Sequence, residues 1–108
     1  MVYQGRWNGT VIAESDDIVE VEGNAYFARS ALKTQFFEES PTTSTCPWKG
    51  RAGYLTVLVG GQRNIDAAWT YLKPSRAAES IRDRVAFWRG VTVAQTNKLA
   101  FLVSRSGT

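Results

Sequence analysis

Two short glycine-containing segments, each next to strand-forming residues, constrain the fold of this chain most strongly. Asn8-Gly9 precedes the β-prone run of residues 10–13, and Gly60-Gly61 separates the apolar run of residues 54–59 from residues 62–65. Such dipeptides accept the positive φ angles of the two-residue turns that join antiparallel strands. The sequence therefore predicts two β-hairpins in a fold built mainly from antiparallel strands.

Further strands are predicted between these two hairpins. In residues 18–22 the alternation is mixed, with Ile18, Glu20 and Glu22 facing one way and Val19 and Val21 the other. Gly23-Asn24 then turns the chain into the apolar residues 25–28. Together with residues 10–13, these segments predict a three-stranded antiparallel meander. By contrast, residues 40–45 are rich in Ser, Thr and Pro, which is typical of a loop.

One short helix is predicted near residues 75–83. Ser75 follows Pro74 and can cap the first backbone amides, while Ala77, Ala78 and Ile81 fall near one face. The predicted fold class is therefore mainly β, or α+β, with antiparallel sheets and a single short helix.

The length of 108 residues fits one domain. We expect a single domain over residues 1–93 and a C-terminal extension over residues 94–108, in which Leu99–Val103 can add an edge strand before a frayed tail. No apolar run approaches the roughly 20 residues of a transmembrane helix, and the N-terminus lacks the apolar stretch of a signal peptide. A cytoplasmic protein that does not bind membranes is the expectation.

The chain has no histidine and one cysteine, Cys46. Structural zinc sites usually need four Cys or His ligands, and Ser–His–Asp or Cys–His catalysis needs an imidazole base. An internal disulfide needs a second cysteine. These three kinds of chemistry are excluded, and we expect neither a metal nor another cofactor.

The charge is unevenly distributed along the chain. Residues 1–39 hold seven acidic and three basic side chains, which is near −4, and residues 40–108 hold three acidic and ten basic ones, which is near +7. This asymmetry can pair two copies in a homodimer, attract an anionic ligand, or be neutralised between neighbouring strands, which we favour. The arginines are scattered, so nucleic-acid binding is not expected.

Aromatic and chemically active side chains are concentrated in two blocks. The candidate site residues are Cys46, Trp48, Lys49, Tyr54, Asp66, Trp69 and Tyr71. The rings of the two blocks either line a concave site or form core between two sheets. Lys49 and Asp66 either flank the mouth of that site or form a surface pair.

Cys46 is the candidate catalytic nucleophile. The nearby cations Lys49 and Arg51 can favour a thiolate, although there is no second cysteine to resolve a disulfide and no histidine base. The alternative is a thiol that packs in the interior as a small apolar group.

Several blocks in fixed order resemble one protein family. They are Trp7–Ser15, Glu22–Phe27, Thr45–Gly50 with Ala52–Tyr54, Asp66–Trp69 with Tyr71, and Val85–Trp88. From about Trp7 to Val93 the chain resembles the domain of unknown function 427 family. That resemblance implies a β-tent-like fold, in which two antiparallel sheets meet at an angle over a shared core.

The chain departs from the family pattern in places. Ala28 and Leu72 stand where prolines are common, and Pro41-Thr-Thr43 replaces a segment that often contains histidine. The family carries a nucleotidyltransferase-like label, but the chain has neither a pair of closely spaced aspartates suited to Mg²⁺ nor a glycine-rich phosphate loop.

Two functions follow as hypotheses. The first is a small binding domain that recognises a small molecule or a peptide element through an aromatic site around Trp48 and Trp69. The alternative is a thiol-dependent enzyme that uses Cys46. The binding domain is favoured, because no catalytic triad, metal site or nucleotidyltransferase motif is present.

Overall fold

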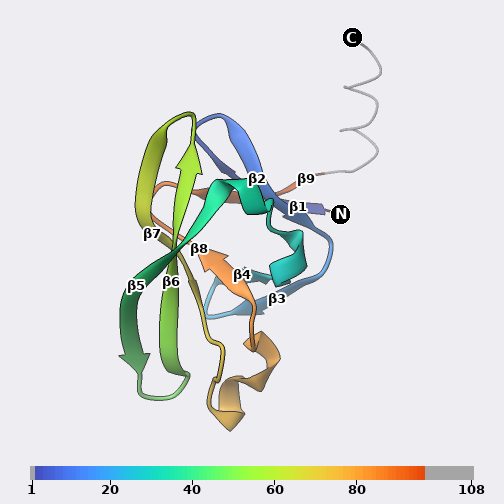
Figure 1. Ribbon diagram of the computed structural model, residues 1–108. Coiled ribbons are helices and arrows are strands. Elements are labelled where there is room, and N and C mark those ends of the chain that lie inside the picture. The colour runs from blue at the N-terminus through green and yellow to red at the C-terminus, as the bar shows by residue number, and fades with distance from the viewer. Residues whose placement is uncertain (1, 97–108) are drawn as a thin grey trace.

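The protein forms two antiparallel sheets in a computed structural model that describes residues 2–96 (Figure 1). The smaller sheet has the strand order β2-β1-β9, with β1 at Val2–Trp7, β2 at Thr10–Ser15 and β9 at Thr92–Thr96. The larger sheet has the order β3-β4-β8-β7-β6-β5. Its strands are β3 at Ile18–Val21, β4 at Asn24–Phe27, β5 at Phe37–Cys46, β6 at Gly50–Val59, β7 at Gln62–Thr70 and β8 at Val85–Phe87. This confirms the mainly β fold with two antiparallel sheets.

Both predicted hairpin turns are present. Asn8 and Gly9 have φ angles of 51° and 73° between β1 and β2, and Gly60 and Gly61 have 59° and 79° between β6 and β7. The two hairpin tips lie side by side at the top of Figure 1, where Asn8 Nδ2 donates a hydrogen bond of 3.3 Å to the carbonyl oxygen of Val59. The turn contacts therefore join the smaller sheet to the larger one.

The two faces of the larger sheet have different roles. One face packs against the smaller sheet and forms the main core, which includes Ile12, Phe27, Leu55, Val57, Val85 and Phe87. The opposite face carries a second cluster, made of Tyr26, Ala52, Tyr71, Ala78, Ile81 and Ala86. Since side chains alternate along a strand, neighbours such as Tyr54 and Leu55 belong to opposite faces.

Three predictions for the segments between the hairpins are wrong. Residues 10–28 do not form a meander, because β2 pairs with β1 in one sheet while β3 pairs with β4 in the other. The turn after β3 also lies one residue earlier than predicted, at Glu22-Gly23, with φ angles of 54° and 79°. Residues 40–45, predicted as a loop, belong to the edge strand β5, whose register shifts between Ser40 and Thr43. A polar edge strand has a composition similar to that of a loop, which explains the wrong prediction.

The predicted helix near residues 75–83 is a short 3-10 segment, η3 at Arg76–Ile81. Ala78 has φ −114° and ψ 23°, which interrupts the helical path after one turn. The Ser75 side chain makes no capping hydrogen bond, so the expected stabilisation of the first turn is missing. Two further 3-10 turns, η1 at Arg29–Ala31 and η2 at Thr34–Phe36, connect β4 to β5.

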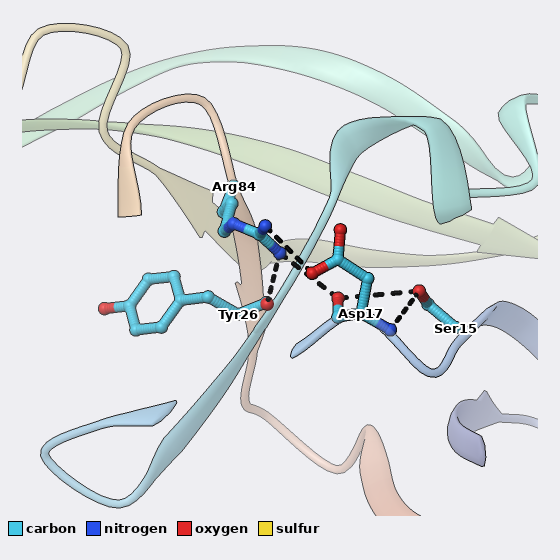
Figure 2. Close-up of polar contacts among 4 residues, drawn as sticks. All are labelled: Ser15, Asp17, Tyr26 and Arg84. Carbon is cyan, nitrogen blue, oxygen red and sulfur yellow. Dashed lines mark hydrogen bonds and ion pairs between the residues drawn. The ribbon is translucent and has the colours of Figure 1, made fainter. Parts of the chain in front are cut away.

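Arg84 joins the corner between β2 and β3 to the strands of the larger sheet (Figure 2). Its guanidinium lies 3.0 Å from Asp17 Oδ1 and donates to the carbonyl oxygens of Asp17 and Tyr26 at 3.1 and 3.4 Å. The amide of Asp17 in turn donates to Ser15 Oγ at 2.8 Å. Pairs such as this one neutralise part of the charge asymmetry of the chain within the molecule.

The C-terminal part of the described chain completes the smaller sheet. β9 pairs with β1 from Val2↔Thr96 to Arg6↔Thr92, so residues 94–96 lie in a strand of this sheet. The predicted edge strand at Leu99–Val103 lies outside the described residues. Within residues 2–96, no helix is long and apolar enough to cross a membrane.

Candidate functional site

The loop between β5 and β6 is held in place by the segment that precedes η3. Gly50, with φ 110°, begins β6, and a Cβ there would lie 3.3 Å from the amide nitrogen of Ser75 and 3.4 Å from the carbonyl oxygen of Lys73. This close approach lets the Ser75 amide donate to the carbonyl oxygen of Lys49 at 2.8 Å. The Ser75 hydroxyl donates to the carbonyl oxygen of Trp48 instead of capping η3.

Glu22 holds the same loop from the opposite side. Its carboxylate forms an ion pair with Lys49 Nζ and accepts a hydrogen bond of 3.2 Å from Trp48 Nε1. The Lys49 ammonium lies 5.3 Å from the ring centre of Trp48 and 5.8 Å from that of Tyr71, within the range of cation–π attraction. Lys49 is therefore a buried cation with a defined set of partners.

These contacts shift the pKa values of both partners. The hydrogen bond from Lys49 lowers the pKa of the Glu22 carboxyl below its usual 4.5. Burial lowers the pKa of Lys49, but the Glu22 carboxylate and the nearby hydroxyls of Tyr71 and Tyr26 more than offset it, so the net pKa is raised above 10.5. Burial also raises the pKa of Tyr71, so its hydroxyl is neutral at physiological pH.

Three aromatic rings lie in a row across the outer face of the larger sheet. Tyr54 on β6 is the cross-strand partner of Trp69 on β7, and Trp88 follows β8. The ring centres of Trp69 and Trp88 are 5.9 Å apart at an interplanar angle of 81°, and those of Tyr54 and Trp88 are 6.5 Å apart at 36°. The Trp69 indole also donates to Tyr26 Oη at 3.1 Å, which anchors the row to β4.

A cavity of about 170 Å³ lies against this row of rings. It is lined by Lys49, Tyr54, Trp69, Tyr71 and Trp88. The structure thus brings together four of the residues predicted from sequence and adds Trp88. The alternation that places Ala86 on the outer face predicts the same face for Trp88, so the signal for this residue was present in the Val85–Trp88 block.

Three predicted site residues do not line the cavity. Trp48 is 41% exposed and lies beside Lys49. Cys46 is half-buried and packs against the second apolar cluster. Asp66 is buried, and it is not the partner of Lys49, which pairs with Glu22. The alternative in which Lys49 and Asp66 form a surface pair is therefore wrong.

Asp66 instead helps to position Trp88. It has a φ angle of 58° at an irregular point of the β6–β7 pairing, and its carbonyl oxygen accepts a hydrogen bond of 2.5 Å from Trp88 Nε1. Its amide donates to Thr56 Oγ1 at 3.3 Å. The hydroxyl of Ser40 lowers the pKa of the Asp66 carboxyl, which keeps it ionised at neutral pH.

Metal ligands are not grouped in the described part of the chain. Among residues 2–96, no cluster of three or more Cys, Asp or Glu side chains lies close enough to hold a metal ion. The fold and the cavity define a small, mainly β domain with a cavity lined by aromatic side chains on the outer face of one sheet.

The chain matches, over residues 3–98, a family model described as a domain of unknown function (DUF427). The match covers most of the chain, and the protein belongs to this family. The match extends beyond the region of resemblance recognised in the sequence, at both ends. A search of curated proteins found no match.

Proposed function

We propose that this protein is a small binding domain that recognises a planar group of a small molecule or peptide through the aromatic cavity. The observation that supports this most directly is the row of Tyr54, Trp69 and Trp88 next to a cavity that also contains the buried cation Lys49. Large rings supply contact area at low entropic cost, and a few polar groups orient the ligand.

The size of the cavity favours a small ligand group. A volume of about 170 Å³ is below the roughly 300–1,000 Å³ of sites for drug-sized molecules. A planar group of one ring or two fused rings, either free or as the side chain of a peptide, fits this size. A cation is disfavoured, because Lys49 already contributes a positive charge to the lining.

Polar groups near the rings support recognition of a substituted ring. Tyr54 Oη lies 2.8 Å from Ser44 Oγ, and either atom can donate a hydrogen bond. Lys49 has a single ion-pair partner among the described residues, so its remaining N–H groups can donate to a ligand carboxylate. We therefore expect an anionic planar ligand to bind more tightly than a neutral one.

The test compares indole-3-carboxylate, indole and cyclohexanecarboxylate as probes, with binding followed by the indole N–H resonances in protein NMR spectra. We expect indole-3-carboxylate to bind best and cyclohexanecarboxylate to bind least. Trp88→Ala should weaken binding at least tenfold. The matched control is Ile65→Ala. Ile65 lies on β7, is 59% exposed and does not line the cavity, so this variant also removes an exposed apolar side chain but should leave binding unchanged. Equal binding of all three probes would refute the proposal.

The alternative is a thiol-dependent enzyme that uses Cys46. This side chain is half-buried beside the second apolar cluster, close to the β5–β6 loop. Iodoacetamide labelling of the folded protein tests it: a catalytic thiolate reacts in the native state, whereas an inert interior thiol reacts only after unfolding.

The proposal also includes the binding partner, the location in the cell and the oligomeric state. The partner is a small molecule or peptide rather than a nucleic acid or a membrane, and the protein acts in the cytoplasm. The charge asymmetry supports pairing of two copies only in part, since the ion pairs Lys49–Glu22, Arg63–Glu38 and Arg84–Asp17 already neutralise it within one chain.

A further inference from the structure

A second groove is lined by residues of the β5–β6 hairpin and of the segment after β7. One end of this hairpin extends past the smaller sheet (Figure 1). The groove has a volume of about 300 Å³ and is lined by Thr43, Arg51, Ala52, Gly53, Leu72 and Lys73. Since side chains alternate along β6, Arg51 and Gly53 belong to the face opposite Tyr54, whereas the side chain of Ala52 packs in the second cluster on the face of Tyr54. The groove shares no lining residue with the aromatic cavity.

The groove contains a glycine, Gly53, inside a β-strand. Gly53 lies in the interior of β6, between Thr43 of β5 and Thr70 of β7, where glycine weakens a strand. A Cβ at this position would have no heavy atom within 4 Å, apart from its own chain neighbours, so close packing within the chain does not explain the glycine. Glycine inside a strand often marks a bulge or a place where a ligand approaches the backbone, and Gly53 combines an open approach to its backbone with such a bulge, because the register of β5 shifts between Ser40 and Thr43.

The charged residues of the groove favour an anionic ligand. Arg51 and Lys73 are both exposed at its edge, the lining contains no carboxylate, and within residues 2–96 neither cation forms an ion pair. Arg51 Nη2 donates only to the neutral Thr43 Oγ1, at 3.3 Å. Guanidinium and ammonium groups bind carboxylates through charge-assisted hydrogen bonds.

The apolar part of the groove favours an aliphatic chain attached to that carboxylate. Leu72 is 57% exposed, and Ala52 and Gly53 add no polar side-chain atoms. We propose that this groove binds an aliphatic carboxylate of medium chain length, with the carboxylate between Arg51 and Lys73 and the alkyl chain over Gly53 and against Leu72. The volume of about 300 Å³ lies at the lower end of the range for small-molecule sites.

The test titrates the full chain with hexanoate, octanoate and decanoate at pH 7, below the concentrations at which micelles form. Affinity should increase about fourfold for each methylene that becomes buried, and decanol should bind at least tenfold more weakly than decanoate. The amide resonances of Thr43, Gly53 and Leu72 should shift in NMR spectra. Shifts confined to the indole N–H groups of Trp69 and Trp88 would place the ligand in the aromatic cavity and overturn the proposal.

Two variants test the lining. Gly53→Val places a side chain in the open groove while it suits a strand, so it should abolish decanoate binding and leave the melting temperature unchanged or higher. Arg51→Gln with Lys73→Gln should weaken binding at least tenfold. The matched control, Lys33→Gln with Arg76→Gln, removes two exposed charges outside the groove and should change affinity less than twofold.

Other occupants of the groove have their own signatures in the same experiments. If a second copy of the chain fills it, sedimentation will show a dimer without fatty acid, and Gly53→Val will dissociate that dimer. That result, or decanoate binding that neither variant changes, would overturn the proposal. Decanoate binding that both variants remove, with a dispersed NMR spectrum for each, would support it.

Discussion

Glu22, in the tight turn between β3 and β4, pairs with the buried ammonium of Lys49 in the loop between β5 and β6. The side chain of Lys49 is only 11% exposed and that of Glu22 is 50% exposed. The pair joins two hairpins of the larger sheet, β3–β4 and β5–β6, that are separated by the two strands β8 and β7 in the order of that sheet. It also fixes the position of the cation that lines the aromatic cavity.

The first prediction concerns the pH dependence of this pair. Because the pKa of Glu22 is lowered from 4.5, its contribution to stability is present above that value and is lost as the pH falls through the folded-state pKa. Because the pKa of Lys49 is raised from 10.5, its contribution is present below that value and is lost at higher pH. Glu22→Gln should lower the melting temperature at pH 7, and the difference from the native chain should shrink below pH 4.5.

A double variant provides the control. Glu22→Gln leaves a buried ammonium without its carboxylate, which is more unfavourable than having neither charge. Lys49→Met keeps most of the apolar stem and removes the charge, so the double variant should be more stable than Glu22→Gln alone. Thermal unfolding of the four proteins at pH 7 measures the coupling, and strictly additive effects would contradict the assigned pair.

The second prediction separates two tryptophans of the cavity wall. Trp69 is partly buried, packs at right angles to Tyr26 at 6.2 Å and donates to its hydroxyl, so Trp69→Ala should lower the free energy of unfolding by about 3 kcal/mol. Trp88 is 43% exposed, and Trp88→Ala should lower it by about 1 kcal/mol. Urea unfolding gives both values. Equal losses would mean that the two rings do not differ in their contribution to the core.

The elements that the sequence predicts well are those specified by a few neighbouring residues. Asn8-Gly9 and Gly60-Gly61 each need two positive φ angles in succession, and few other dipeptides accept them. The pairing of β1 with β9, or of β4 with β8, joins segments that are far apart in the chain. No local pattern encodes such pairing, so the strand order could not be predicted from the sequence and is known from the structure.

The same distinction applies to the candidate site. Lys49, Tyr54, Trp69 and Tyr71 were found because large rings and a lysine are concentrated in two blocks that a hairpin brings together. Glu22 had no such signal, since its role depends on how a distant turn lies against the β5–β6 loop.

The third prediction tests what the Ser75 hydroxyl does. In the structure it donates to the carbonyl oxygen of Trp48, whereas the sequence suggested a helix cap. Ser75→Ala should cost about 1 kcal/mol and shift the amide resonances of Trp48 and Lys49. Ser75→Thr keeps the hydroxyl and serves as the control. Shifts limited to the amides of Ala77 and Ala78 would instead indicate a cap.

The last prediction separates two contributions of Asn8. Its φ of 51° suits the turn between β1 and β2, and its side-chain amide donates to the carbonyl oxygen of Val59 at the tip of the other hairpin. Asn8→Gly keeps the turn geometry and loses only the contact between the tips, so it should lower the free energy of unfolding by about 0.5–1 kcal/mol.

Asn8→Ala loses the same contact and also places a Cβ in the left-handed region, which adds about 1–2 kcal/mol of strain. Urea unfolding of the two variants should therefore give a clearly larger loss for alanine. The difference between them measures the turn, and the loss for glycine measures the contact between the sheets. If Asn8→Gly were as stable as the native chain, the hydrogen bond to Val59 would not hold the two hairpin tips together.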